Sequence, residues 1–593
     1  MLAPTIPARL FEQAKQQPAS PAYYVKRLGN YVPTSWSEYA RLVMRASKSL
    51  IALGCEPGST VSILGFNRPE WIVMDVAIMT VGGAPAGIYT TCSPSEVRYI
   101  IGHAESPVVL VENAAQWEKV KQERDNLPLL THVVLMEGAT VDDPMCMTWA
   151  EFLAKGDDLA DARVLERMHA LKPEGLATLI YTSGTTGPPK GVMLSHENVA
   201  WTAEAALQMT GITSSDRALS YLPLSHIAEQ MFSIHGHITA GMRLYFAESL
   251  EKLPENLKEV RPTLVFGVPR IWEKFHAGLS AKLGEAKGAK AKLAKWARAV
   301  GRDVSDFKAN GKDLPFVLSL KYAVANKLVF SKVKAAIGLD AGRMHVSGAA
   351  PVAKEVLEFM ATLDIVINEV YGQSEDTGPT TFNMRGKVRF GTVGQTVPGV
   401  EVKIADDGEI CVRGKNVFLG YYKEPEATAE TLIDGWLHSG DLGAFDKDGF
   451  LTITGRKKEI IITAGGKNIA PKNIEGALKN HPLVGEAVVI GDRRKFLSVL
   501  ITLEPDAAAR FATKHNVQDV ANLHHSALVR DELQKCLDEV NKEFARVEQV
   551  KKFTVLPRAF SMDTGELTPT LKVKRKVVND VWSKEIEAMY EGA

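Results

Sequence analysis

The sequence has 593 residues, which is too long for one hydrophobic core and predicts two or more domains. Its 70 basic and 70 acidic residues balance, so bulk charge argues against a nucleic-acid-binding protein and against an acidic-surface protein. Five scattered cysteines, none in a Cys-x-x-Cys spacing, indicate reduced thiols of a cytoplasmic protein rather than a disulfide framework or a zinc site: Cys55, Cys92, Cys146, Cys411 and Cys536.

The N-terminal part, residues 7–125, alternates between helical and strand patterns. Residues 36–53 repeat apolar side chains at helical spacing and stop at Gly54, whereas residues 60–64 and 107–111 are typical of buried strands. This alternation predicts parallel sheets covered by helices. The most apolar stretch, residues 71–86, contains Asp75 and two glycines, so we expect a buried helix and no membrane span. The N-terminus lacks the features of a secretory signal.

A glycine-rich stretch, residues 181–191, follows a strand pattern at residues 176–180. It combines glycines, hydroxyl side chains and a lysine, which together suit a polyanion: Thr182, Ser183, Gly184, Thr185, Thr186 and Lys190. Two prolines separate Gly187 from Lys190, and a glycine follows the lysine, so the Walker spacing fails. The alternative is a flexible surface turn, although the prolines would stiffen it. The stretch therefore predicts a phosphate-binding loop.

Strand patterns resume at residues 217–222 and 263–266, and residues 276–343 then differ in composition. Between residues 282 and 313, nine basic residues face four acidic ones, among Ala-rich helix formers with interspersed aromatic side chains: Lys282, Lys287, Lys290, Lys292, Lys295, Arg298, Arg302, Lys308 and Lys312 against Glu285, Asp303, Asp306 and Asp313. We favour a solvated helical insertion for this stretch. The alternative is that the stretch makes a peripheral contact with the inner face of an anionic membrane.

The C-terminal part begins after strand patterns at residues 400–413 and 449–462. We place a domain boundary near residues 456–458, which separates an N-terminal domain (1–455) from a C-terminal domain (456–593). Strands are expected at residues 487–490 and 497–501, and helices at residues 507–515 and 530–548.

Five further stretches carry chemistry-bearing residues. They are Leu-Pro-Leu-Ser-His at residues 222–226, Ser-Gly-Ala-Ala-Pro at 347–351, Glu-Val-Tyr-Gly-Gln-Ser-Glu at 369–375, Ser-Gly-Asp at 439–441, and Gly-Arg-Lys-Lys-Glu at 455–459, with Gly-Gly-Lys at 465–467 behind it. Near the C-terminus, Thr-Pro-Thr-Leu-Lys-Val-Lys-Arg covers residues 568–575. Taken alone, residues of these kinds more often have a structural role than a functional one. A histidine beside apolar residues usually packs in the core, a lone carboxylate usually lies on the surface, and a basic run is usually a solvated face.

In this order and over nearly the whole chain, these stretches resemble the motifs of the adenylate-forming superfamily, which comprises acyl-CoA synthetases, adenylation domains and luciferases. The resemblance implies an α/β fold: a large N-terminal domain of helix-covered sheets with a β-rich subdomain, and a small mobile α+β C-terminal domain. It also implies ATP, Mg²⁺ and coenzyme A as ligands.

The resemblance assigns roles to individual residues. Tyr371 would pack on adenine, Ser374 would contact a phosphate, Glu375 would hold Mg²⁺ and Asp441 would accept the ribose hydroxyls. Further nucleotide contacts are implied for the adenine-side loop, its neighbouring strand and an arginine: Gly348, Ala349, Ala350, Glu369, Val370, Gly372 and Arg456.

The remaining implied roles concern catalysis and the acyl and thiol sites. His226 would lie near the phosphate and acyl sites, Lys458 would be the hinge, and Lys572 would bridge the carboxylate and the α-phosphate. Thr570-Leu571 replaces the Ser-Gly that many relatives carry, so Lys574 and Lys576 remain alternatives. The thiol path would involve Gly465, Gly466 and Lys467. Trp272, with Gly267, is a candidate for the acyl tunnel; the alternative is a core aromatic.

The implied function is ATP-dependent activation of a long-chain fatty acid to an acyl-adenylate, followed by transfer to coenzyme A. Similarity to bacterial long-chain and bubblegum-type synthetases, around residues 221–275 and 460–471, carries the chain-length expectation. The alternatives are a medium-chain or aryl acid–CoA ligase and an acyl-AMP ligase that loads a carrier protein. A catalytically silent nucleotide-binding scaffold is a different class, and the joint presence of Lys572, Glu375 and Asp441 argues against it.

Overall fold

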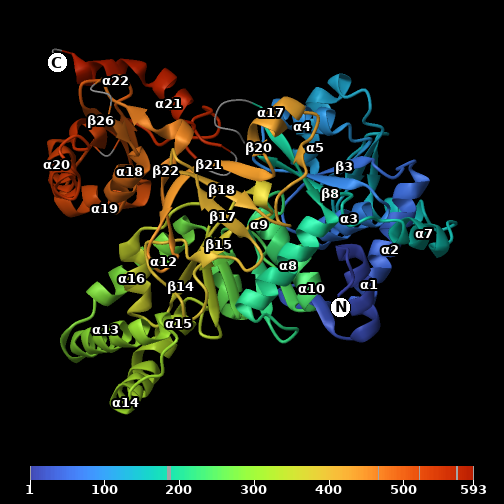
Figure 1. The fold of residues 1–593 in the computed structure, drawn as a ribbon, viewed down its shortest axis with the longest axis horizontal. Helices are drawn as coiled ribbons and strands as arrows, with labels where there is room; N and C mark the ends of the chain where they lie inside the picture. Colours follow the sequence, from blue (N-terminus) through green and yellow to red (C-terminus); the bar gives the residue numbers. More distant parts are fainter. Residues whose placement is uncertain (1, 183–187, 465–466, 520, 569–571, 592–593) are drawn as a thin grey trace.

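The computed structural model describes residues 2–182, 188–464, 467–519, 521–568 and 572–591 (Figure 1). Its described part is built from sheets covered by helices, so the α/β prediction is confirmed. Six residues with predicted roles lie outside the described residues: Ser183, Gly184, Thr185, Thr186, Gly465 and Gly466.

An eight-stranded sheet occupies the N-terminal half, in the order β19-β9-β8-β4-β3-β5-β6-β7. Its strands from β8 to β7 pair in parallel, and β9 and β19 add antiparallel edges. The strands are β3 (Thr60–Leu64), β4 (Ala84–Ile88), β5 (Val108–Val111), β6 (His132–Leu135), β7 (Cys146–Thr148), β8 (Leu176–Thr182), β9 (Lys190–Ser195) and β19 (Gly420–Tyr421). The associated helices are α2 (Trp36–Ala52), α3 (Pro69–Thr80), α4 (Pro94–Ala104), α5 (Ala114–Glu123), α6 (Trp149–Ala154) and α7 (Asp161–His169).

A nine-stranded sheet follows the order β16-β15-β14-β13-β12-β10-β11-β1-β2 and is parallel from β14 to β1. Its strands are β1 (Pro21–Arg27), β2 (Asn30–Ser35), β10 (Arg217–Ser220), β11 (Arg243–Phe246), β12 (Leu264–Gly267), β13 (Met344–Ser347), β14 (Ile367–Tyr371), β15 (Thr381–Phe382) and β16 (Gln395–Thr396). The helices between them are α1 (Ile6–Gln16), α8 (His196–Thr210), α9 (Ile227–Gln230), α10 (Gly236–Ala240), α11 (Leu253–Val260), α12 (Pro269–Gly284) and α16 (Lys354–Ala361).

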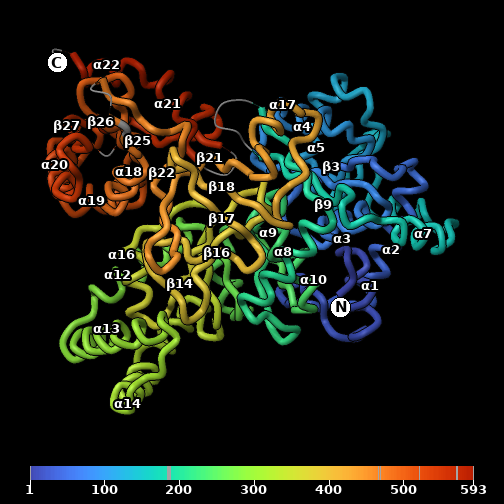
Figure 2. The backbone as a smooth tube through the Cα atoms, in the orientation of Figure 1, coloured from blue at the N-terminus to red at the C-terminus, as the bar shows by residue number. Residues whose placement is uncertain are grey.

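Among the described residues, three smaller sheets lie in the C-terminal half, and one of them is the two-stranded antiparallel pair of β23 (Ile461–Ile462) and β24 (Asn468–Ile469). An antiparallel sheet contains β17 (Glu401–Ile404), β18 (Glu409–Arg413), β20 (Leu432–Ile433), β21 (Trp436–Phe445) and β22 (Leu451–Arg456), with α17 (Pro425–Thr431) beside it. The last sheet contains β25 (Val484–Ile490), β26 (Leu497–Leu503) and β27 (Val550–Val555). Its helices are α18 (Pro471–Lys479), α19 (Pro505–His515), α20 (Ala527–Lys542), α21 (Arg575–Val581) and α22 (Ser583–Tyr590). This last part forms a lobe across the molecule from the N-terminus (Figure 2).

The lysine-rich stretch is helical. After α12, the chain forms α13 (Gly288–Ala309), α14 (Phe316–Ala325), the π-helical turn η3 (Asn326–Phe330) and α15 (Ser331–Ala336). Helices α13 and α14 lie at the lower left edge of the molecule (Figure 1). Among the helices of the described part of the chain, none combines the length and the apolar character needed to cross a membrane.

Two predicted helices have other boundaries. The helix expected at residues 71–86 ends at Thr80, because Gly82, with φ of +84°, and Gly83 turn the chain into β4. The helix expected at residues 530–548 ends at Lys542. There the Asn541 side chain binds both backbone groups of Val550, which starts β27. In both places a strand pairing overrides the helical pattern.

Candidate functional site

A cavity of about 730 Å³ lies where the two large sheets meet the antiparallel sheet and the C-terminal lobe. One part of its wall is apolar and comes from α8, the segment around η2 (Met231–His235), and strands β12 to β15: Leu207, Met209, Ile212, Met231, Phe232, Leu264, Phe266, Met344, Val346, Val370 and Phe382. Another part is polar: Thr182, Lys190, His226, Ser374, Glu375, Glu409, His438, Arg456, Lys457, Lys458, Glu459 and Lys572. Such a cavity suits a ligand with one apolar and one charged end.

Sheet topology places several of these side chains together. The carboxyl ends of parallel strands share one edge of a sheet, which is where open α/β sheets bind ligands. Thr182 ends β8, Ala349 follows β13, and Gly372 and Ser374 follow β14; all four line the cavity. Ala349 has φ of +67°, a left-handed conformation that non-glycine residues adopt at some energetic cost.

The ends of the glycine-rich loop are held by an antiparallel pair. Thr182 of β8 lies opposite Lys190 of β9, so both flanks of the loop face the cavity. The Lys190 ammonium lies 4.7 Å from the ring centre of Tyr421, and the Tyr421 hydroxyl donates a hydrogen bond of 2.9 Å to Glu375. Our sequence interpretation did not include Tyr421. No local signal marks it, because it reaches the site only through the pairing of β19 with β9.

Glu375 is half-buried in the cavity wall, and burial raises the pKa of its carboxyl above the ordinary value. Among the described residues, no group of three or more His, Cys, Asp and Glu side chains could hold a metal ion. A single carboxylate still fits Mg²⁺, which usually completes its shell with substrate phosphates and water. The donor set therefore suits a metal ion that arrives with a phosphate ligand.

Asp441 is buried in β21 and already has two partners. The Tyr371 hydroxyl donates to Oδ2 at 2.9 Å, and Nε of Arg456 donates to Oδ1 at 2.9 Å. The β21–β22 register places Arg456 opposite Asp441, and the nearby carboxylate raises the pKa of the guanidinium. Because each carboxylate oxygen has a second lone pair, Asp441 can still accept from a ligand.

Lys572 reaches this cavity from the C-terminal lobe, whereas Lys574 and Lys576 are not among the described residues that line it. The Lys572 side chain is exposed at the cavity, yet protein surrounds it. Burial, and next the positive charge of Arg456, lower the pKa of its ammonium to about 8. Burial also lowers the pKa of His226 to about 4, with a smaller contribution from Lys572. His226 is therefore a neutral imidazole, and its Nδ1 accepts the Ala228 N–H.

Some predicted site residues are not among the described residues that line the cavity. The Glu369 side chain does not line the cavity. Its carboxylate accepts a hydrogen bond from the Gly391 N–H, and burial raises the pKa of the carboxyl to about 8. Gly348 is buried against Val370, where a Cβ atom would lie 2.6 Å from a Val370 methyl carbon. Ala350 and Lys467 are exposed outside the lining. Of the residues predicted on the adenine side, Ala349, Val370 and Gly372 line the cavity, whereas Tyr371, like Asp441, is not among the described residues that line it.

Trp272 lies in the apolar core and is fully buried. Its Nε1–H is directed at the carbonyl oxygens of Gly267 and Val346, at 3.2 and 3.3 Å. Neither Trp272 nor Gly267 is among the described residues that line the cavity. The structure therefore favours the alternative of a core aromatic over a role in the acyl tunnel.

A charged cluster around Lys457, next to the predicted hinge residue Lys458, has no counterpart in the sequence predictions. Glu409 is buried in β18 and accepts hydrogen bonds from His438 (3.1 Å), Lys457 (3.0 Å) and the Gly440 N–H (2.8 Å). Burial alone would raise its pKa, but the bonds from His438 and Lys457 outweigh it and hold the pKa below the usual value. Lys457 also pairs with Asp407. This cluster ties the segment beside Lys458 to the antiparallel sheet.

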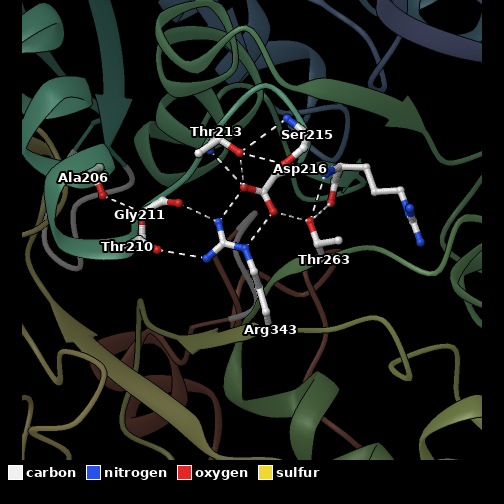
Figure 3. Close-up of polar contacts among 9 residues, drawn as sticks. Ala206, Thr210, Gly211, Thr213, Ser215, Asp216, Thr263 and Arg343 are labelled. Atoms are coloured by element: carbon white, nitrogen blue, oxygen red, sulfur yellow. Dashed lines mark hydrogen bonds and ion pairs between the residues drawn. The ribbon is translucent and has the colours of Figure 1, made fainter. Parts of the chain in front are cut away.

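The wall at the end of α8 is held by an ion pair (Figure 3). Nε of Arg343 donates to Asp216 at 2.7 Å, and the same guanidinium donates to the carbonyl oxygens of Thr210 and Gly211. Asp216 also accepts from the Thr213 N–H and the Thr263 hydroxyl. Burial opposes ionisation of Asp216, but Arg343 and the other donors hold its pKa below the ordinary value. The pair fixes the segment that carries Met209, Thr210 and Ile212 of the wall.

We expect Arg343→Met to destabilise the protein by about 3 kcal/mol, because it leaves the buried Asp216 carboxylate without its cation. Arg41→Met is the matched control, because Arg41 makes a similar two-bond pair with Glu38 but both side chains are exposed. The free energy of unfolding of this variant should fall by no more than about 1 kcal/mol. Urea unfolding at neutral pH measures both. Since the folded-state pKa of Asp216 is lowered, this stabilisation is present above its ordinary pKa and disappears as pH falls through the folded value. Equal losses in the two variants would contradict the role of Arg343.

Two family models match the chain. The model described as AMP-binding enzyme matches residues 10–422, and the model described as AMP-binding enzyme C-terminal domain matches residues 458–593.

Curated relatives match over most of both chains. The chain is 40% identical to a long-chain-fatty-acid–CoA ligase ACSBG2 of Xenopus laevis, over 94% of this chain and 80% of that protein. It is 36% identical to a long-chain-fatty-acid–CoA ligase FadD15 of Mycobacterium bovis, over 99% of this chain and 97% of that protein. Among solved structures, O-succinylbenzoate coenzyme A synthetase of Bacillus subtilis, in complex with ATP and magnesium ion, superposes with a TM-score of 0.68 at 21% identity, covering 96% of this chain and 98% of that chain.

Proposed function

The chain belongs to the AMP-binding enzyme family, and from this premise we propose that it is a long-chain fatty-acid–CoA ligase. It would activate a fatty acid with ATP and transfer the acyl group to coenzyme A. The observation that carries the proposal is the two-part cavity: an apolar wall from α8 to β15 opens onto a polar wall with Lys190, Glu375, Arg456 and Lys572.

The apolar part of the cavity supports an aliphatic substrate. Its wall is rich in Met, Leu, Ile and Phe side chains, including Met209, Met231, Met242 and Met344. Flexible methionine side chains adapt to alkyl chains of differing shape. Each methylene group buried there contributes about 0.8 kcal/mol to binding. This favours an acyl chain over an aryl acid, which needs a flatter and shorter site.

We propose that the polar part holds MgATP. Lys190 and Thr182, with the loop between them, would bind the β- and γ-phosphates, and Asp441 would accept from the ribose hydroxyls. Ala349, Val370 and Gly372 would line the adenine site, and Tyr371, whose hydroxyl donates to Asp441, would pack on the ring beside them. Glu375, oriented by the Tyr421 hydroxyl, would hold Mg²⁺, and a metal ion bound there neutralises charge on the phosphate oxygens.

In the proposed first step, a carboxylate oxygen of the fatty acid attacks the α-phosphorus and the bond to the β-phosphate breaks. The products are the acyl-adenylate and pyrophosphate. The Lys572 ammonium would bridge the incoming carboxylate and the α-phosphate, and so offset the repulsion between two anions. Neutral His226 would border the same region without adding charge.

In the proposed second step, the thiol of coenzyme A loses its proton to water and its sulfur attacks the acyl carbonyl carbon; the bond from that carbon to the phosphate oxygen breaks, and AMP leaves with its electron pair. The C-terminal domain, residues 456–593, would first rotate about Lys458, which removes Lys572 and brings Lys467 and its neighbours to the thiol path. The Lys457 contacts to Glu409 and Asp407 belong to the present orientation and would be exchanged during that rotation.

The proposal predicts CoA-dependent AMP release that rises with the chain length of the acid. Fatty acids from medium to long chain, together with benzoate, would be compared in an AMP-release assay with and without coenzyme A. We expect long-chain acids to have the highest kcat/KM and benzoate to be nearly inactive. Pyrophosphate release without any stimulation of AMP release by coenzyme A would point to an acyl-AMP ligase, and a preference for benzoate or medium-chain acids would overturn the long-chain assignment.

A further inference from the structure

Helix α14 and the turn η3 expose an apolar strip to solvent. The exposed fractions of its side chains range from 41% to 78%, and four of the five positions follow one another at four-residue spacing. We name these residues the α14 ridge: Phe316, Val317, Leu320, Val324 and Leu328. Side chains at this spacing lie along one side of a helix. The other side packs on α13 through Ala325, Val329 and Phe330, so the ridge is not needed for the local core.

Positive charge surrounds the ridge. Residues 282–334 contain thirteen basic and four acidic residues, a formal charge of +9 in a chain whose net charge is zero. Three exposed lysines lie in the same continuous helical segment as the ridge: Lys321 in α14, Lys327 in η3 and Lys332 in α15. Within the described residues, none of these three lysines takes part in an ion pair, whereas Lys308 and Lys334 both pair with Asp364. The charge beside the ridge is therefore available to a partner.

The combination of apolar ridge and free ammonium groups fits an anionic lipid surface. Isolated exposed apolar side chains are common on proteins, but a contiguous apolar strip marks an interaction surface. Amphipathic helices with lysines beside the apolar face lie in the headgroup region of bilayers. A second copy of this chain is a poorer partner, since a two-fold contact would bring lysines against lysines.

We propose that the α14 ridge docks on an anionic membrane surface, with its apolar side chains at the headgroup–acyl boundary and Lys321, Lys327 and Lys332 against lipid phosphates. This contact is peripheral, and the lipid surface is a partner distinct from the proposed fatty acid, ATP and coenzyme A. The position of α13 and α14 at the edge of the molecule leaves room for a planar partner (Figure 1).

Vesicle flotation of the full-length chain tests the proposal. The vesicles contain phosphatidylcholine alone or with phosphatidylglycerol, at low and high salt. We expect binding only to the anionic vesicles, weakened by salt. Lys321→Gln/Lys327→Gln/Lys332→Gln should lower that binding about tenfold or more, and Phe316→Ser/Leu320→Ser should lower it even at low salt. Because all five side chains are exposed, thermal unfolding should be unchanged.

Matched controls use exposed residues elsewhere. Lys514→Gln/Lys535→Gln/Lys551→Gln removes the same charge from the C-terminal lobe, and Leu129→Ser/Leu528→Ser removes two other exposed leucines. Both should bind vesicles as the wild type does. The proposal is overturned if the wild type does not float with anionic vesicles, if the ridge variants bind like the controls, or if they change only the oligomeric state. AMP release in detergent, which needs no vesicle, tests the ligase proposal separately.

Discussion

Lys572→Ala should lower the rate of pyrophosphate release by about 100- to 1000-fold, the usual cost of removing one preorganised charge contact from a transition state. The ammonium lies in the same cavity as Glu375, Arg456 and His226, so its removal leaves the two reacting anions without their bridge. The same variant should still convert supplied acyl-adenylate and coenzyme A to the thioester. Separate assays of pyrophosphate release and thioester formation measure the two steps.

The neighbouring lysines provide the controls for this variant. Lys574→Ala and Lys576→Ala remove the same charge from the same segment but from outside the cavity lining, so both should release pyrophosphate at nearly the wild-type rate. If Lys572→Ala stayed active and one neighbour lost activity, the catalytic lysine would have been misassigned.

The pH profile gives a second readout for Lys572. Its pKa of about 8 in the free protein means that the cationic form declines as pH rises above that value. The kcat/KM for pyrophosphate release should therefore fall above pH 8, because this ratio reports the free enzyme. A profile that stays flat to pH 10 would exclude a requirement for the cation.

Lys458→Pro should leave pyrophosphate release intact and reduce thioester formation to background. Lys458 lies in a short 3-10 turn, η5 (Lys457–Glu459), between β22 and the C-terminal lobe. Proline fixes φ near −65°, so the backbone could no longer turn at this position, while a first-turn helical geometry remains accessible. Measurement of both steps on one preparation distinguishes this result from misfolding.

Lys458→Ala is the matched control, because it removes the same side chain and keeps the freedom of φ. Both steps should survive in it. If Lys458→Pro also supported both steps, the hinge would have to lie elsewhere, and a loss of both steps would indicate damage to the contacts of Lys457 with Glu409 and Asp407.

The strand patterns that surround the site could be predicted well, since they depend on short-range composition. The apolar runs before Thr182 and after Arg217 are strands, as predicted. The segments that follow the parallel strands lie at one edge of their sheet. The ends of strands and helices could be predicted less well than the elements themselves. The apolar stretch after Trp71, for example, divides into a helix and a strand, because β4 pairs between β3 and β8.

The direction in which each side chain of a motif points could not be predicted from the sequence either. Glu369 and Tyr371 belong to the same strand and the same motif. Yet Glu369 binds the backbone of Gly391, while the Tyr371 hydroxyl binds Asp441. Trp272 lies near cavity-lining residues in sequence and packs instead into the core beneath β13. Which side of a strand or helix faces a cavity depends on the neighbouring elements, and these are contributed by distant segments.

By itself, the sequence determined the order of the motifs, the phosphate-loop composition, the serine–glycine–aspartate signature and the excess of lysine near α13. These properties follow from residue types at short spacing, which fix backbone freedom and charge before any packing. Only the tertiary structure decided that Tyr421 supports Glu375, that Arg343 holds Asp216, and that the α14 ridge remains exposed. Each of these depends on which distant elements pack together or leave a surface uncovered, and that is settled by the packing of the whole chain.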